Sequence, residues 1–254
     1  MPLISIITIT NNREKYIAES IESVLKQSFK DWELIIIDDA STDNTAEVVE
    51  EYTAQDHRIK FHHENINLGI TKARNLALGL AQGKYIAVLD SDDVWADSDK
   101  LQKQYLFLEN NSDHVLVGGA VIVMNEHGQE ISRFKNPSTD KNIRSGILLR
   151  NPFLNSSSMF RREVAVNCGT YENYTVGEDY DLFLKIGKMG KFANLEDYLV
   201  KYRKHDSGIT WSKRVRAAKD HLIIIAKFKK NYPNYFLAVI KGYLRLFLAY
   251  FLSL

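Results

Sequence analysis

The sequence predicts an α/β fold in which a mostly parallel sheet is flanked by helices and followed by a basic, apolar helical tail. Three observations lead to this expectation. β-Branched runs alternate with amphipathic segments along the first half of the chain, and these runs are mostly apolar, as in strands buried on both faces of a parallel sheet. In addition, residues 201–254 hold 12 Lys and Arg against 2 Asp and Glu, although the whole chain has a net charge of +1.

The elements of the first half follow one another with short links. The opening run Leu3–Thr10 is typical of a buried strand, and the apolar spacing after Tyr16 is that of a helix. A further helix is expected after Asp39, with Thr42 or Asp43 as its N-cap. Parallel strands of this kind imply right-handed crossovers. Strands are predicted over residues 3–10, 32–37, 59–62, 85–89 and 115–124, and helices over 16–27, 71–81 and 99–109.

The alternation stops after about residue 125. Residues 125–155 are polar and predict loops. A short strand near 157–160, a helix that starts near Asp179 and a strand near 199–202 follow. We expect residues 126–210 to extend the same domain and to build the second wall of a site, and residues 211–254 to form a tail.

The composition excludes several classes of protein. With 254 residues, 45% of them hydrophobic and 26% charged, the chain is too apolar for a disordered protein and lacks a collagen-like pattern. Its single cysteine, Cys168, excludes an intrachain disulfide and favours a reducing cytosol. The start Met1-Pro2 leads into a strand-like run without a basic region or a cleavage site, so no signal peptide is predicted.

Acidic residues follow two of the predicted strands. Asp38-Asp39 comes after one strand, and Asp90, Asp92 and Asp93 come after another. Ligands of open α/β sheets bind outside the carboxyl ends of the strands. An Asp-x-Asp turn can place two oxygen ligands on a Mg²⁺ or Mn²⁺ ion that is shared with substrate phosphates. The alternative is that each aspartate is a helix cap or a turn residue.

No glycine-rich phosphate loop is present. Neither GxGxxG after the first strand nor GxxxxGK[ST] occurs, which disfavours a Rossmann dehydrogenase and a P-loop NTPase. A bound diphosphate would therefore need a metal ion and basic side chains. Lys72 and Arg74 are candidates, with a solvated helix face as the alternative.

Two later clusters can also carry chemistry. Glu178-Asp179-Tyr180-Asp181 precedes an amphipathic run, and a carboxylate fixed at a helix start can serve as a general base. Adjacent acids would raise its proton affinity, and a nearby metal would lower it. The alternative is an acidic first turn favoured by the helix dipole. In residues 202–207, His205 is either a metal ligand, a donor to a diphosphate, or an exposed loop histidine.

Taken in order, five motifs of the chain resemble those of a known family. They are TNNREKYI at 10–17, IDDASTD at 37–43, NLG at 67–69 with ARN at 73–75, LDSDD at 89–93 and EDYD at 178–181. This order is similar to that of the family 2 inverting glycosyltransferases, whose GT-A fold is Rossmann-like. The resemblance covers about residues 3–210. Residues 155–161 and 198–205 also resemble bacterial enzymes that extend lipooligosaccharide, O-antigen or capsule chains.

The resemblance implies a nucleotide-sugar site in about residues 1–125. Asp39 would hydrogen-bond the nucleotide base, Arg74 would lie near the nucleotide, and Asp90 would face the ribose. Thr10 and Asn11 occupy the end of the first strand, where the family usually has a tyrosine that stacks on uracil. UDP is the expected nucleotide. Asn11 replaces the aromatic ring, so the chain departs from the family pattern at the position that would stack on the base.

The resemblance also implies the chemistry, with residues 126–210 as the acceptor and catalytic-base half. Asp92, with His205, would hold a Mn²⁺ or Mg²⁺ ion that bridges the diphosphate. Asp179 would take the proton from an acceptor hydroxyl as it attacks the anomeric carbon of the donor, which inverts that carbon. The expected enzyme moves a hexosyl or N-acetylhexosaminyl group from a nucleoside-diphosphate sugar to a glycan or lipid-linked acceptor.

Two other functions are alternatives to this one. A sugar-1-phosphate nucleotidyltransferase would need a glycine-rich, basic loop after the first strand, and residues 10–13 are not one. A catalytically silent, membrane-associated subunit that binds nucleotide sugars is disfavoured by the acidic pairs Glu178-Asp179 and Asp90-x-Asp92.

The tail predicts a surface helix. Tyr235–Leu254 is long enough to cross a bilayer, but Lys241 and Arg245 near its middle disfavour a span. The apolar face and the basic residues before it predict a cytoplasmic protein that is peripheral on the anionic inner face of the cell membrane. No nucleic acid partner is expected. The alternative is that this helix packs on the catalytic domain or on a second subunit, which would give a homodimer through the C-terminal helices.

Overall fold

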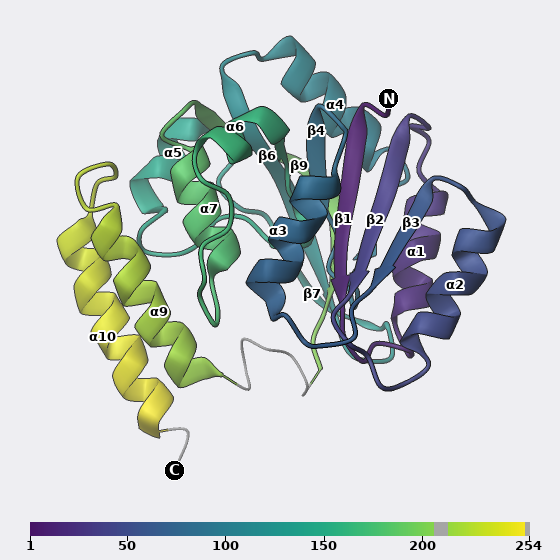
Figure 1. Cartoon of the computed structure of the whole chain (residues 1–254). Helices are drawn as coiled ribbons and strands as arrows, with labels where there is room; N and C mark the ends of the chain where they lie inside the picture. Colours follow the sequence, from purple (N-terminus) through teal and green to yellow (C-terminus); the bar gives the residue numbers. More distant parts are fainter. Residues whose placement is uncertain (206–212, 252–254) are drawn as a thin grey trace.

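The structure is a computed structural model that describes residues 1–205 and 213–251. One mixed sheet has helices on both faces, and a pair of helices near the C-terminus lies against one side of it (Figure 1). Three expectations fall partly outside the described residues. They are the boundary between residues 210 and 211, residues 206–207 of the cluster around His205, and residues 252–254 of the predicted C-terminal helix.

The strands and helices are as follows. The strands are β1 (Ile4–Thr10), β2 (Trp32–Asp38), β3 (Ile59–His63), β4 (Tyr85–Val88), β5 (Val94–Trp95), β6 (His114–Met124), β7 (Glu130–Phe134), β8 (Met159–Arg161) and β9 (Lys191–Arg203). The helices are α1 (Ile17–Leu25), α2 (Thr45–Gln55), α3 (Ile70–Leu80), α4 (Lys100–Asn110), α5 (Asp140–Gly146), α6 (Arg162–Asn167), α7 (Glu178–Ile186), α9 (Arg214–Lys227) and α10 (Tyr235–Phe251), with a 3₁₀ turn η1 (Asn155–Ser157).

The sheet has the order β3-β2-β1-β4-β8-β6-β9-β5, and β7 pairs with β6 at one side. The first four strands are parallel, as expected, and β6 is parallel to β9. β8 runs antiparallel to both of its neighbours, β4 and β6, and β5 runs antiparallel to β9. The sheet is therefore mostly parallel, and its carboxyl-end edge gathers the ends of β1, β2 and β4.

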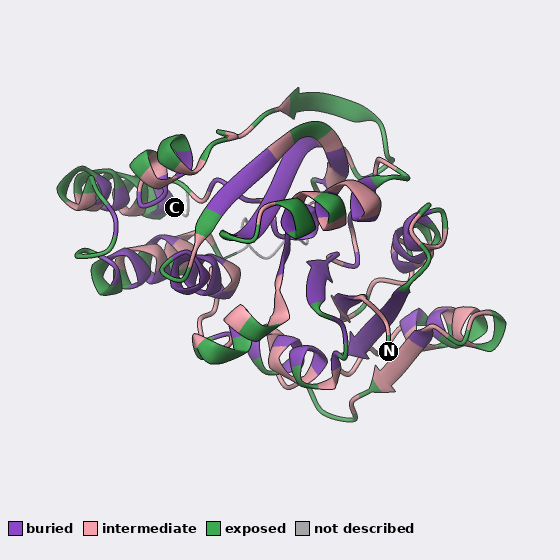
Figure 2. Ribbon diagram, turned by 90° about the horizontal axis from the view of Figure 1, so that it is seen from above, coloured by how far each residue is buried: buried purple, intermediate pink, exposed green. Residues whose placement is uncertain are grey.

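Alternate residues of the central strands point to opposite faces of the sheet, and each face has its own core. Ile4 and Ile6 pack with α1, α2 and α4, while Ile7 and Ile35 pack with α3, α6 and α7. Figure 2 shows that burial is concentrated in the sheet and on the inward sides of the helices. This two-faced burial explains why the central strands are mostly apolar and do not alternate between apolar and polar residues.

The structure corrects several expectations for the second half. Residues 125–155 hold β7 and α5 and are not only loop, and the strand expected at 199–202 extends over the whole of β9. β7 is mostly exposed and α5 has seven residues, so neither carries a clear apolar pattern. β5 and α6 are additional elements, and α9 lies within the predicted helical tail. The predicted caps of α2 are also wrong, because Asn44 is its N-cap, although the Asp43 carboxylate accepts from Thr45 N–H at 3.0 Å.

The C-terminal helices α9 and α10 form an antiparallel pair beside the sheet domain (Figure 1). Small residues of α10, Ala238, Gly242 and Ala249, are the buried ones, because they let its backbone approach α9. In the part of the chain that the structure describes, no helix is both long and apolar enough to cross a membrane.

Candidate active site

A cavity of about 1050 Å³ opens at the carboxyl-end edge of the sheet. Its walls are formed by the segments after β1, β2 and β4, the start of α7 and the end of β9. All eight of the predicted site residues line it, namely Thr10, Asn11, Asp39, Arg74, Asp90, Asp92, Asp179 and His205. Lys72, the other basic candidate, is exposed and does not line the cavity. The sheet therefore brings together residues that are up to 195 positions apart in the chain.

Asp39 connects three segments at one end of the cavity. Its carboxylate accepts from the backbone N–H groups of Leu68 at 2.5 Å and Gly69 at 3.0 Å, directly before α3. The side-chain amide of Asn11 donates to the carbonyl of Asp39 at 2.7 Å. Among the described residues, the buried hydroxyl of Thr10 has no hydrogen-bond partner. These contacts preorganise the end of the cavity that the sequence assigns to the nucleotide.

Arg74 of α3 joins the end of β4 to the start of α7. Its guanidinium lies 3.0 Å from Asp90 Oδ1 and 2.9 Å from Glu178 Oε1. Burial acts to lower the pKa of Arg74, but the two carboxylates outweigh it and raise that pKa. The side-chain amide of Asn155 also donates to Asp90 Oδ1, at 2.8 Å. Burial is the main cause that raises the pKa of Asp90, against the opposing charge of Arg74.

Asp92 and His205, the predicted metal ligands, lie next to each other at the edge of the cavity. His205 Nε2 lies 3.0 Å from Asp92 Oδ2, and Arg13 Nε donates to the same oxygen at 3.3 Å. Burial acts to raise the pKa of Asp92, but the His205 hydrogen bond and the Arg13 charge outweigh it and lower that pKa. Within residues 1–205 and 213–251, no group of three or more His, Cys, Asp or Glu side chains is arranged to hold a metal. These two side chains alone do not make a complete ligand set, so a divalent ion here would need further ligands from a bound substrate.

Two residues behind this pair fix its position. Asp93 accepts from Ser156 Oγ at 2.5 Å and from Arg203 N–H at 2.9 Å, and it is fully enclosed. Burial first, and then Asp92 and Asp90, raise the pKa of Asp93 well above its usual value. The Arg203 guanidinium donates to Asp92 O at 2.9 Å. Sequence reasoning missed Arg203 and Ser156, because their partners are more than 60 residues away.

Asp179 lies in the first turn of α7 and faces the cavity. Burial, with the neighbouring charge of Glu178, raises its pKa to about 7, and Arg74 acts in the opposite direction. Gly177 before it has φ of +95°, a conformation that favours glycine. A carboxylate with a pKa near neutrality on a rigid helix start can accept a proton at physiological pH.

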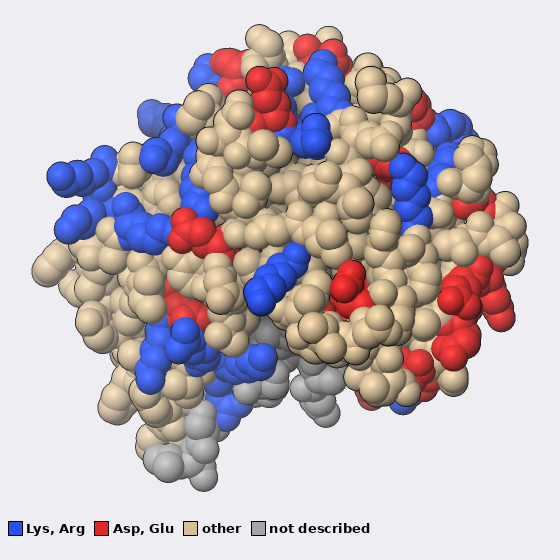
Figure 3. Space-filling model, viewed as in Figure 1, with Lys and Arg blue, Asp and Glu red and all other residues tan. Residues whose placement is uncertain are grey.

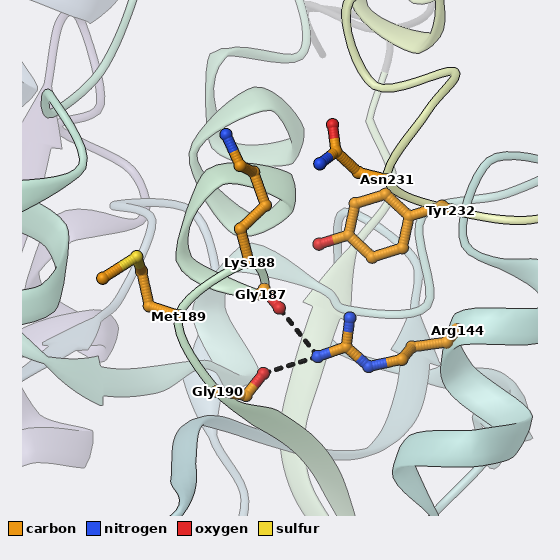
Figure 4. Close-up of a pocket in the computed structure, with 7 residues that line it drawn as sticks. All are labelled: Arg144, Gly187, Lys188, Met189, Gly190, Asn231 and Tyr232. Carbon is orange, nitrogen blue, oxygen red and sulfur yellow. Dashed lines mark hydrogen bonds between the residues drawn. The ribbon is translucent and has the colours of Figure 1, made fainter.

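A second cavity, of about 460 Å³, lies at the other end of α7. Arg144 donates to the carbonyls of Gly187 at 2.7 Å and Gly190 at 2.5 Å, as Figure 4 shows. Its Nε bonds to the Asp140 carboxylate at 2.8 Å. Arg144 therefore closes the turn after α7, and none of the predicted site residues lines this cavity.

The chain is similar in sequence to known proteins. A model of the family described as "Glycosyl transferase family 2" matches residues 5–169. An uncharacterized glycosyltransferase of Haemophilus influenzae is 36% identical, over 80% of this chain and 66% of that protein. The O-antigen biosynthesis glycosyltransferase WbnJ of Escherichia coli is 32% identical, over 81% of each chain. The Escherichia coli UDP-Glc:α-D-GlcNAc-diphosphoundecaprenol β-1,3-glucosyltransferase WfgD is also 32% identical, over 90% of this chain and 87% of that protein.

Solved structures show a similar fold. The crystal structure of S. aureus TarS 1-349 in complex with UDP-GlcNAc superposes with a TM-score of 0.72 at 22% identity, covering 97% of this chain and 73% of that chain. The mannosyltransferase PcManGT from Pyrobaculum calidifontis, in complex with GDP-Man and Mn²⁺, superposes with a TM-score of 0.68 at 19% identity, covering 98% and 75%.

Proposed function

The chain belongs to glycosyl transferase family 2, and from this membership we propose that it transfers a hexosyl or N-acetylhexosaminyl group from a UDP sugar to a hydroxyl of a lipid-linked glycan. Its fold is of the GT-A type, as expected from the sequence. The observation that carries the proposal is that Asp92, in the segment after β4, and Asp179, at the start of α7, line the same cavity. The reaction would be one step in the assembly of a bacterial surface polysaccharide. O-antigen biosynthesis, the process in which WbnJ takes part by its name, is an example.

The donor half of the cavity is proposed to lie within residues 1–125. Asp39 is already held by two backbone N–H groups, so its remaining lone pairs can receive a donor from the base. Thr10 and Asn11 lie beside it, and Asp90 faces the ribose. Arg74 neutralises the carboxylates around the nucleotide. UDP is proposed because the nucleotide sugar bound to the similar TarS fold is UDP-GlcNAc.

Asp92 and His205 would hold a Mn²⁺ or Mg²⁺ ion beside the diphosphate. Such an ion would offset the negative charge that develops on the leaving group. Asp92 is suited to this task because its low pKa keeps it anionic. The Arg13 guanidinium donates to Asp92 Oδ2 at 3.3 Å, and a change of its side-chain rotamer would bring its positive charge to the diphosphate.

Asp179 performs the proton transfer in the proposed mechanism. Its carboxylate accepts the proton of the acceptor hydroxyl while the hydroxyl oxygen forms a bond to the anomeric carbon. The bond from that carbon to the diphosphate oxygen breaks on the opposite face, so the anomeric configuration inverts. Residues 126–210, which supply Asp179, therefore form the acceptor half, and residues 211–254 form the tail.

The tail is proposed to attach the protein to the inner face of an anionic membrane. The helix α10 presents an arc of exposed apolar side chains that includes Phe236, 78% exposed, and Phe247, 67% exposed. Basic residues border the arc, since Lys219 of α9 lies over the Tyr250 ring at 5.5 Å and Lys241 is exposed on α10. Each basic residue near an anionic surface contributes about 1 kcal/mol. A lipid-linked acceptor would be reached from such a surface.

A panel assay tests the proposed reaction. UDP-glucose, UDP-galactose and their N-acetylamino counterparts are incubated with the protein, Mn²⁺ and a lipid extract of bacterial membranes, and the release of UDP is measured. We expect release that requires the lipid extract and is abolished by EDTA. Release of inorganic diphosphate from UTP and a sugar 1-phosphate, with no UDP released, would instead identify a nucleotidyltransferase and reject the proposal.

A further inference from the structure

We infer that Asp220 of α9 is a positioning residue for the transfer reaction, because its carboxylate holds the segment that leads into the base-bearing helix α7. The inference rests on the proposed function and extends it to the tail of the chain. No motif of the sequence pointed to Asp220, which lies 41 residues beyond Asp179.

The segment in question is residues 170–177, which has neither helix nor strand. Its last three residues, Thr175, Val176 and Gly177, line the catalytic cavity and precede Asp179. The backbone N–H groups of such a segment have no carbonyl acceptors from a helix or a sheet, so they need other hydrogen-bond acceptors. Whichever group accepts from them fixes this wall of the cavity.

Asp220 is the acceptor near the end of the segment, at the cavity, whereas a side chain of α3 accepts near its start. Asp220 Oδ2 accepts from Thr175 N–H at 3.1 Å and from Val176 N–H at 3.3 Å, and the side chain is fully buried. Its other oxygen lies 3.0 Å from Arg216 Nε. A buried carboxylate is unfavourable unless it is paired and hydrogen-bonded. Here one carboxylate satisfies two consecutive backbone donors, so the segment is held at a defined distance from α9.

Two further residues on the same side of α9 support this attachment. A Cβ on Gly177 would lie 3.2 Å from Ile224 Cδ1, so Ile224 packs directly against the backbone before α7. Lys227 Nζ donates to Asp181 Oδ1 at 2.6 Å, in the first turn of α7 itself. The spacing of Asp220, Ile224 and Lys227 places all three on one face of the helix. The helix α9 thus holds both the segment and the turn that carries the base.

The consequence concerns the geometry of proton transfer and not the binding of the donor. A misplacement of about 1 Å at a reacting group can cost about 10²-fold in rate. Asp39 and Asp92 lie on segments after β2 and β4, which Asp220 does not contact in the described structure. Loss of the Asp220 charge should therefore lower turnover and leave UDP affinity unchanged.

The test compares Asp220→Asn with the matched control Asp56→Asn. Asp56 also accepts from a backbone N–H, that of Arg58 at 2.9 Å, but it lies outside the cavity. Turnover is measured with the most active UDP sugar of the panel and the lipid extract, UDP affinity by calorimetry with Mn²⁺, and folding by thermal unfolding. We expect Asp220→Asn to lower kcat by about 10-fold to 100-fold with an unchanged Kd for UDP. The control should retain both values.

The outcomes separate this inference from the proposed function. An unchanged kcat in Asp220→Asn overturns it, and so does an equal fall in kcat and UDP affinity, which a general loss of structure would give. If Asp220→Asn does not fold, Lys227→Met, whose side chain is one-third exposed, should show the same split. Asp179→Asn is assayed alongside. If that variant stays active, the proposed base is wrong, whereas an inactive Asp179→Asn with a fully active Asp220→Asn rejects only the positioning role.

Discussion

Neighbouring side chains give Asp92 and Asp179 opposite pKa shifts within one cavity. Burial acts to raise both pKa values, but at Asp92 the contacts with His205 and Arg13 outweigh it. At Asp179 the charge of Glu178 adds to burial, and the pKa reaches about 7. Two carboxylates with separated proton affinities suit two roles, one as an anionic ligand and one as a proton acceptor.

Replacing Asp179 by asparagine should remove the proton acceptor without removing the donor site. We expect transfer to fall by about 10² to 10⁴-fold, the usual contribution of a general base. UDP affinity, measured by calorimetry, should change little because the proposed nucleotide contacts lie at the ends of β1, β2 and β4. A variant that keeps more than half of the wild-type turnover would show that another group is the base.

The raised pKa of Asp179 predicts a pH dependence. A base works only when it is deprotonated, so kcat/KM should be fully developed above pH 7 and should decline as the pH falls below about 7. A carboxylate with an ordinary pKa would keep its activity down to about pH 4. A rate profile between these values decides the point, and a flat profile from pH 5 to pH 8 would contradict the assignment.

Replacing Asp92 by alanine should weaken metal and nucleotide binding together. With Mn²⁺ present, calorimetry should show a lower UDP affinity in Asp92→Ala, and removal of Mn²⁺ should weaken UDP binding to the wild type but not to the variant. Asp90→Ala is the comparison, because it should lower affinity for uridine as well. If the wild type binds UDP equally with and without Mn²⁺, Asp92 has no metal role.

Single residues were predictable where a local rule applied and not where a distant partner was needed. The carboxylates at 38–39 and 90–93 could be placed together because the carboxyl ends of parallel strands share one edge of the sheet. Arg74 and Glu178 form an ion pair although they are 104 positions apart, and the sequence around neither residue indicates this pairing. The hydrogen bond from Asn155 to Asp90 is likewise not indicated by the sequence around either residue.

Among the elements, the burial of each strand decided what the sequence could predict. β1, β2 and β4 are apolar at almost every position because both faces are covered, and this pattern is unambiguous. β9 was found only in its last part, since its middle carries exposed Glu196 and Asp197 and the pairing with β6 is irregular there. The helix α9 belongs to the predicted helical tail, but nothing in its local sequence indicates its contacts with the loop before α7.

The exposed face of α10 predicts a measurable attachment to lipid. Changing Phe236 and Phe247 to serine should abolish flotation with anionic liposomes, because it removes apolar surface from the centre of the arc. Turnover of a short, water-soluble acceptor should be unaffected. Ile131→Ser, on the exposed strand β7, is the matched control and should float normally. If the wild type stays unbound on anionic liposomes at low salt, α10 instead covers another protein surface.

At the scale of the whole molecule, the charges are divided between two sides. Figure 3 shows Lys and Arg gathered over the side formed by α9 and α10, while Asp and Glu are grouped around α2 on the opposite side. Glu47, Glu50 and Glu51 of α2 contribute to the acidic group. The net charge is near zero, but the positive and negative charges are concentrated on different sides of the molecule. An anionic surface would therefore orient the protein with α9 and α10 toward it.

The position of β8 also has a consequence for the way the chain is made. β8 lies between β4 and β6, yet it follows both of them in the sequence. On the ribosome, both strands emerge before the residues that join them, and until residue 161 is synthesised β4 and β6 each have an unpaired edge. A nascent chain exposes both strand edges at once while β6 has left the ribosome and β8 has not, and chaperone capture should concentrate in that window.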